Sequence, residues 1–104
     1  MMSLKERLLE DMKLAMKEKD TVRKNSVQMA RAAVLQVEKD NRITLDDEGV
    51  VEVIAKEVKK RRDCLPDYEK SGRQDLLADL QREIQILLQY CVTSEGQYNN
   101  RMVK

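Results

Sequence analysis

Residues 74–91 read QDLLADLQREIQILLQYC, and this stretch decides the fold class because its apolar residues recur every three or four positions. That period places them along one face of an α-helix, with the polar residues on the other face. The apolar face consists of Leu76, Leu77, Leu80, Ile84, Leu87, Leu88 and Cys91. The pattern therefore predicts a helix over residues 74–90 that packs against other elements.

Helix start signals divide the preceding chain into further segments. Ser3 followed by Glu6 forms a capping box, which opens a first helix that ends in the charged residues 17–20. Asp20 can cap a second helix, which ends near residues 40–42. The predicted apolar faces are Leu4, Leu8, Met12, Ala15 and Met16 in the first helix and Val22, Val27, Ala30, Ala33, Val34 and Val37 in the second.

A third helix is predicted to begin after Thr44 or Asp46, either of which could cap it, and to stop at Gly72. Pro66 falls inside this segment. A proline in a helix interior removes a hydrogen bond and costs about 3 kcal/mol, so we expect a kink or break near residues 63–65. The predicted apolar face is Val50, Val51, Ile54, Val58, Leu65 and Tyr68.

Four amphipathic helices joined by short connections predict an all-α fold of two antiparallel helical hairpins. The core must be aliphatic, because the 104 residues include no Phe, no Trp and three Tyr. We expect one helical domain over residues 1–91. Residues 92–104 are polar and show no period, so we expect a frayed tail there.

The composition argues against catalysis and against a bound metal or cofactor. The chain contains no His, which is both the commonest general base and the commonest metal ligand. Cys64 and Cys91 lack the spacing of metal ligands, and no Gly-rich phosphate-binding loop is present. We therefore expect no catalytic residues, no metal and no cofactor, and we expect that the chain is not an enzyme.

Location and partners are constrained less directly. Two thiols in a chain of this size are typical of reduced cytosolic proteins, and the first residues resemble no signal peptide, so we expect a cytoplasmic protein. No apolar run approaches the roughly 18 residues that span a bilayer, so no membrane partner is expected. The net charge of +1 predicts nothing about partners, and only local clusters can do so.

Four charged residues lie in or beside the predicted apolar faces. Glu57 and Arg61 are four residues apart on the third helix, Glu83 lies within the face of the fourth, and Arg23 lies at the edge of the second. Buried charges are tolerated when they are paired. The preferred interpretation is a polar network between helices that fixes their register. The alternative is that these groups line a functional groove.

A basic cluster follows on the same third helix. It consists of Lys56, Lys59, Lys60, Arg61 and Arg62, and Arg73 could lie near the far end of the same surface. Lysine and arginine side chains on one surface can bind phosphates with strong salt dependence. The competing interpretation is a solvated face balanced by neighbouring acids. No aromatic residues interleave with these bases, so stacking on unpaired nucleic-acid bases is not indicated.

Several stretches of the chain carry a recognisable family pattern. The most specific is Lys56-Glu57-x-Lys59-x-Arg61-x-Asp63 followed by Tyr68-Glu69-Lys70-Ser71-Gly72-Arg73-Gln74-Asp75-Leu76. Others are Ser3-Leu4-Lys5-Glu6-Arg7-Leu8, Asp11-Met12-Lys13-x-Ala15-Met16-Lys17, Arg23 leading to Val27, Met29 and Ala32-Ala33-Val34, and Glu83-Ile84 through Leu87 to Tyr90. Over about residues 3–91 the chain resembles the YqeY family.

This resemblance implies an all-helical module linked to tRNA or to a tRNA-linked enzyme. YqeY proteins are similar to the C-terminal region of GatB, the B subunit of the glutamine-dependent amidotransferase that acts on misacylated tRNA. There the related region engages tRNA, and the chemistry lies elsewhere. Two departures matter. We expect the family's second small helical domain to be absent here, and Gln28 stands where a basic residue is expected.

Three functional hypotheses follow. The leading one is a tRNA-associated binding module whose phosphate contacts come from Lys56, Lys59, Lys60, Arg61, Arg62 and Arg73. The alternative is a protein-interaction or oligomerisation module that uses open helical faces and has no nucleic-acid role. The third, carbon–nitrogen ligase activity with glutamine as amido donor, rests on family association alone.

Overall fold

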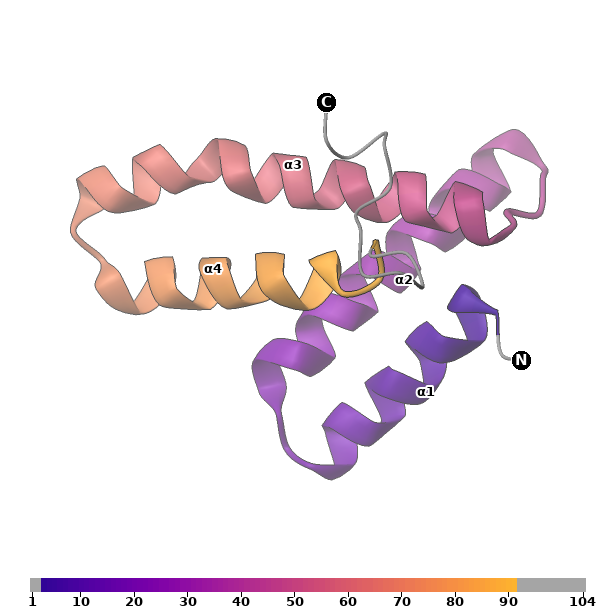
Figure 1. Ribbon diagram of the computed structural model, residues 1–104, viewed down its shortest axis with the longest axis horizontal. Coiled ribbons are helices and arrows are strands. Elements are labelled where there is room, and N and C mark those ends of the chain that lie inside the picture. Colours follow the sequence, from indigo (N-terminus) through magenta and orange to yellow (C-terminus); the bar gives the residue numbers. More distant parts are fainter. Residues whose placement is uncertain (1–2, 92–104) are drawn as a thin grey trace.

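The computed structural model describes residues 3–91, which form four helices and no strand (Figure 1). In chain order these are α1 (Leu4–Lys17), α2 (Thr21–Asn41), α3 (Asp47–Ser71) and α4 (Gln74–Leu88). Helices α1 and α2 form one antiparallel hairpin, and α3 and α4 form the other. The predicted all-α fold of two hairpins is confirmed. The predicted frayed tail, residues 92–104, lies outside the described residues.

Local sequence signals set the helix ends. The side-chain oxygens of Ser3, Asp20 and Asp46 accept hydrogen bonds from the backbone N–H three residues later, at 3.2, 3.2 and 2.8 Å. Asp46, rather than Thr44, therefore caps α3. Gly72 ends that helix with φ of 73°, a left-handed conformation that glycine adopts without strain. Helix α4 is shorter than predicted and ends at Leu88, with a turn at residues 89–91.

Helix α3 runs unbroken for 25 residues through Pro66, so the predicted break near residues 63–65 is wrong. Proline removes one N–H donor from the ladder, while the turns on both sides keep theirs. Leu65 and Tyr68, which flank the proline, pack partly buried against the core and hold those turns in place. The alternative, a bend of the axis at Pro66, stays a prediction.

The core lies where the two hairpins meet. It consists of Leu8, Val27, Ala30, Val34, Val50, Val53, Ile54, Val58, Leu80, Ile84, Ile86, Leu87, Tyr90 and Cys91. Two predicted core positions are exposed, Met16 at 56% and Leu76 at 40%. Conversely, Val53 and Ile86 are buried but were not predicted. Ile86 is buried because α4 is covered on two sides, by α3 and by α2.

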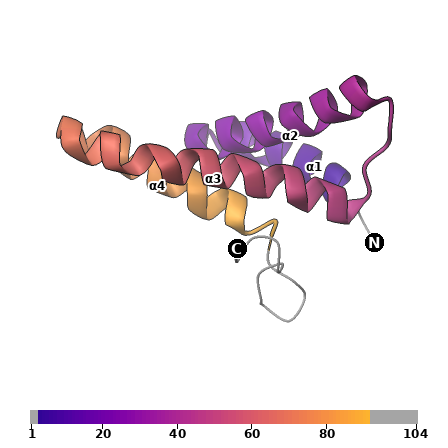
Figure 2. The ribbon, with the colours of Figure 1, turned by 90° about the horizontal axis from the view of Figure 1, so that it is seen from above.

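The α3–α4 hairpin extends beyond the end of α2 (Figure 2). Its buried residues stop at Arg61 on α3 and begin again at Leu80 on α4. Residues 62–79, which contain no fully buried side chain, form a hairpin tip. The tip brings part of the predicted basic cluster, Arg62 and Arg73, away from the core.

Candidate functional site

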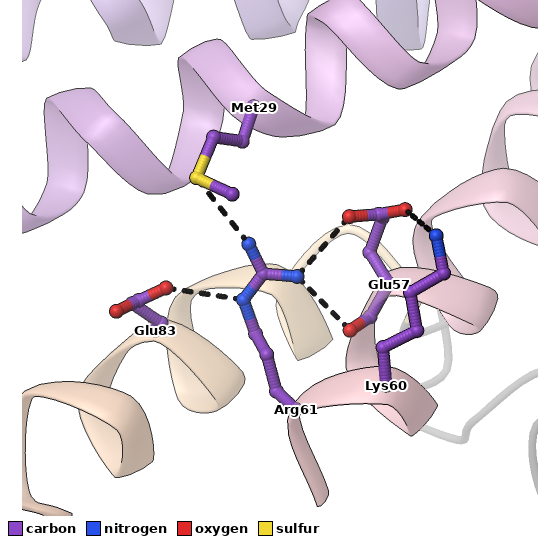
Figure 3. Close-up of polar contacts among 5 residues, drawn as sticks. All are labelled: Met29, Glu57, Lys60, Arg61 and Glu83. Carbon is purple, nitrogen blue, oxygen red and sulfur yellow. Dashed lines mark hydrogen bonds and ion pairs between the residues drawn. The ribbon is translucent and has the colours of Figure 1, made fainter. Parts of the chain in front are cut away.

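Arg61 on α3 is the centre of a polar cluster that joins three helices (Figure 3). Its Nε donates to Glu83 Oε1 on α4 at 3.1 Å. Its Nη1 donates to the Glu57 carboxylate at 3.2 Å and to the Glu57 carbonyl at 3.0 Å. Its Nη2 contacts the sulfur of Met29 on α2 at 3.6 Å. The structure thus brings together three of the four residues for which a network was predicted.

This Arg61 cluster is matched in charge and largely shielded from water. Arg61 is 7% exposed, and a buried guanidinium is tolerated only with ionic partners. Lys60 Nζ reaches the other oxygen of Glu57 at 3.2 Å from the solvent side. All three guanidinium nitrogens of Arg61 are engaged, so it cannot reach a phosphate. We therefore remove Arg61 from the predicted phosphate-binding residues.

The remaining bases of the predicted cluster are exposed. Lys56, Lys59 and Lys60 stand three and four residues apart and share the outward face of α3, and Arg62 is exposed beside them. Arg73 lies at the N-terminal end of α4, and its Nε is 3.6 Å from Oδ1 of Asp75. We call Lys56, Lys59, Lys60, Arg62 and Arg73 the basic surface.

Arg23, the fourth residue of the predicted network, lies elsewhere. Its Nε is 3.5 Å from Oδ2 of Asp20, and Nη2 of Arg82 on α4 lies 2.9 Å from the same oxygen. The backbone N–H of Arg23 bonds to the Asp20 side chain, and this bond, followed by the charges of Arg82 and Arg23, lowers the pKa of that carboxyl. Asp20 thus caps α2 and ties it to α4.

A second tie fixes the end of α4 to α1. The buried Tyr90 hydroxyl donates a hydrogen bond to Asp11, and the Arg7 guanidinium lies 5.3 Å from the centre of the Tyr90 ring. Burial, followed by the Asp11 hydrogen bond and charge, raises the pKa of Tyr90, which keeps the hydroxyl protonated as a donor. Sequence reasoning missed Tyr90, Asp11 and Arg82, because each partner is distant in the chain.

The described residues contain no arrangement typical of nucleophilic or metal catalysis. Both cysteines are unpaired, and burial raises the pKa of the Cys91 thiol to about 11, which keeps it an unreactive thiol. Within residues 3–91 no group of three or more His, Cys, Asp or Glu could hold a metal ion. No helix in that part of the chain is long and apolar enough to cross a membrane.

The sequence is similar to known proteins over most of its length. The family model described as Yqey-like protein matches residues 5–94. Two fungal relatives, both named altered inheritance of mitochondria protein 41, mitochondrial, come from Kluyveromyces lactis and Eremothecium gossypii. Each is 32% identical over 84 residues, which cover 80% of this chain and 45% and 46% of the relatives. The chain spans about half the length of these relatives, and it belongs to the family of Yqey-like proteins.

Proposed function

We propose that this chain is a tRNA-binding helical module that holds phosphates on the basic surface of α3 and the hairpin tip. One observation carries the proposal. Among the basic residues of α3, Arg61 faces inward and is paired with two glutamates. The other four, Lys56, Lys59, Lys60 and Arg62, are exposed. The resemblance of the family to the tRNA-engaging region of GatB supports the same assignment.

The geometry suits contacts to a backbone rather than readout of a sequence. Lys56 and Lys59 are flexible, exposed point charges, and such side chains bind phosphates without distinguishing bases. Asp63, Asp67 and Glu69 are also exposed on α3. Because these acids offset part of the positive potential, we expect modest affinity that is strong only at low salt.

The test is a titration of the purified chain with tRNA at low salt. The variant in which Lys59, Lys60 and Arg62 are all changed to Ala should bind much more weakly than the wild type. Arg31→Ala is the matched control, because Arg31 lies on α2 and no ion pair involves it among the described residues. Equal binding by the triple variant and the wild type would refute the proposal, as would no binding by the wild type.

A second candidate is a protein-interaction or oligomerisation module. Its support is a groove of about 230 Å³ between α1 and α2, in which Leu8, Leu9, Val34 and Leu35 are bordered by Lys5, Glu6 and Arg31. Leu35 itself is 45% exposed. Analytical ultracentrifugation of the chain, together with a pull-down of protein partners, distinguishes this candidate from tRNA binding. Self-association or capture of a specific protein would support it. A strict monomer that captures no protein argues against this candidate.

We further propose that the chain acts without catalysis in the cytoplasm. The shielded Cys91 thiol and the absence of His support a non-catalytic role. Purified chain should form no product from glutamine and misacylated tRNA, and formation of amidated tRNA would overturn this part. The two unpaired cysteines fit a reducing compartment. The fungal relatives are named as mitochondrial proteins, so fractionation of cells tests the location.

A further inference from the structure

A groove of about 430 Å³ lies between the start of α2 and the outer side of α4. Arg23 and Arg82 line it together with Gln81, Gln85 and Gln89, and no acidic side chain lines it among the described residues. Pockets for small ligands are typically about 300–1,000 Å³. We call this the arginine–glutamine groove.

The groove on the opposite side of α4 has the reverse character. It measures about 520 Å³ and is lined by Asp79 and Glu83 together with uncharged residues of α2, among them Asn25 and Gln28. The arginine–glutamine groove is thus lined by two basic side chains, and the other groove by two acidic side chains, one of which is paired with Arg61. The arginine–glutamine groove selects for anions, and its counterpart does not.

The two arginines of the groove already converge on one anion. Arg23 Nε and Arg82 Nη2 approach the same oxygen of Asp20, at 3.5 and 2.9 Å. One carboxylate thus faces two guanidiniums, which leaves a net positive charge. The other guanidinium nitrogens of both residues make no hydrogen bond to the described residues. An arginine guanidinium can donate forked hydrogen bonds to the oxygens of a phosphate.

The glutamines extend the site along α4. Gln81, Gln85 and Gln89 are spaced four residues apart, are exposed, and form one row beside the arginines. An amide side chain offers both donors and an acceptor without adding charge. Such a row suits the hydroxyl groups and base edges of a nucleotide whose phosphate is held at the arginines.

We propose that the arginine–glutamine groove binds a nucleotide, with the phosphate on Arg23 and Arg82 and the remainder along the glutamine row. This site is distinct from the basic surface, which lies on α3 and the hairpin tip. A free nucleotide and a nucleotide unit of single-stranded RNA present the same chemistry. The proposal therefore does not depend on the binding of tRNA by α3.

The experiment is heteronuclear NMR on the isotopically labelled full chain during titration with adenosine monophosphate, with adenosine as the uncharged control. The nucleotide should shift the amide signals of Arg23 and of residues 81–89, and adenosine should not. A second titration uses a short oligoribonucleotide. If it binds more tightly than the mononucleotide and shifts the same signals, the ligand of the groove is RNA. Stronger binding of the mononucleotide identifies the ligand as a free nucleotide.

Variants complete the test. Arg82→Gln should weaken nucleotide binding roughly tenfold, because it removes a charged hydrogen-bond donor. Asp20→Asn keeps a good helix cap but removes the competing charge, so it should strengthen binding. Arg31→Gln, an equal loss of charge outside the groove, should change nothing.

Two results would overturn the proposal. One is the absence of signal shifts in residues 81–89 on titration with either nucleotide probe. The other is equal weakening by Arg31→Gln and Arg82→Gln. The α3 triple variant separates this inference from the proposed function, because it should lose tRNA and retain adenosine monophosphate.

Discussion

At the scale of the residue, two neighbouring arginines have different roles because one is buried and the other is exposed. Arg61 is 7% exposed and holds two glutamates from α3 and α4, whereas Arg62 is exposed to solvent. Removing one partner of a buried ionic cluster leaves uncompensated charge. The two positions should therefore respond very differently to the same substitution.

Arg61→Ala should lower the free energy of unfolding by about 3 kcal/mol, because it leaves Glu83 without its ionic partner and Glu57 with only the exposed Lys60. Arg62→Ala should change it by less than about 0.5 kcal/mol, as is usual for exposed positions. Urea unfolding followed by circular dichroism measures both. Similar midpoints for the two variants would contradict a structural role for the Arg61 cluster.

Glu38 provides a pH-dependent contribution at the same scale. The Lys5 ammonium, 2.7 Å away, and the Leu45 backbone N–H lower its pKa below the ordinary value of 4.5. A carboxyl whose pKa is lower in the folded state stabilises the fold above its unfolded pKa. That stabilisation is lost as the pH falls through the lower, folded-state pKa.

Glu38→Gln should therefore be less stable than the wild type at pH 7, and the difference should shrink as the pH falls below about 4.5. Glu10→Gln is the control for the loss of one carboxylate, since Glu10 is exposed on the same hairpin. Thermal unfolding across a pH series measures both differences. A stability gap between Glu38→Gln and wild type that persists unchanged at low pH would contradict the assignment.

At the scale of the element, α3 shows how packing overrides a local breaker. The capping residues act within four positions of their partners, so Ser3, Asp20 and the Gly72 stop could be predicted from the sequence alone. Pro66 is also local, but the expected break ignored the partly buried Leu65 and Tyr68 beside it. The contacts of these two side chains with the core keep α3 continuous at Pro66.

Pro66→Ala should stabilise the protein by about 1–3 kcal/mol, because it restores a helical N–H and removes the steric clash of the ring. Asp67→Ala, at the next exposed position, should have a smaller effect, below about 0.7 kcal/mol. The melting temperatures of both variants test this. No gain from Pro66→Ala would mean that α3 already accommodates the proline without cost.

Partners distant in the sequence limited the prediction of the site. The Glu57–Arg61 pair could be predicted because its residues are four apart on one helix, and Glu83 because it interrupts an apolar face. The Asp20–Arg82 and Asp11–Tyr90 pairs are separated by 62 and 79 residues. No period or motif marks such pairs, and they appear only once the hairpins pack together.

At the scale of the whole molecule, the two hairpins are packed unevenly. The core gathers near the crossing of α2 with the α3–α4 hairpin, and the hairpin tip extends away from it (Figures 1 and 2). Segments with few buried contacts open locally more often than the core does. The molecule should therefore be stable at the crossing and dynamic at the tip.

Hydrogen exchange should reveal this gradient within one helix. The backbone amides of residues 64–70 of α3 should exchange faster than those of residues 53–59, which include buried Val53, Ile54 and Val58. Mass spectrometry of the native chain can compare the two segments directly. Equal protection along α3 would contradict the uneven packing.

The most direct test of the central claim, a tRNA-binding module whose phosphates lie on α3, is the salt dependence of tRNA affinity. Between about 50 and 200 mM salt the affinity of the wild type should fall steeply. The Lys59, Lys60 and Arg62 triple Ala variant should show a slope shallower by about 2–3, since each of the three phosphate contacts adds roughly 0.7–0.9. Arg31→Ala should keep the wild-type slope. Identical slopes for all three proteins would contradict the account.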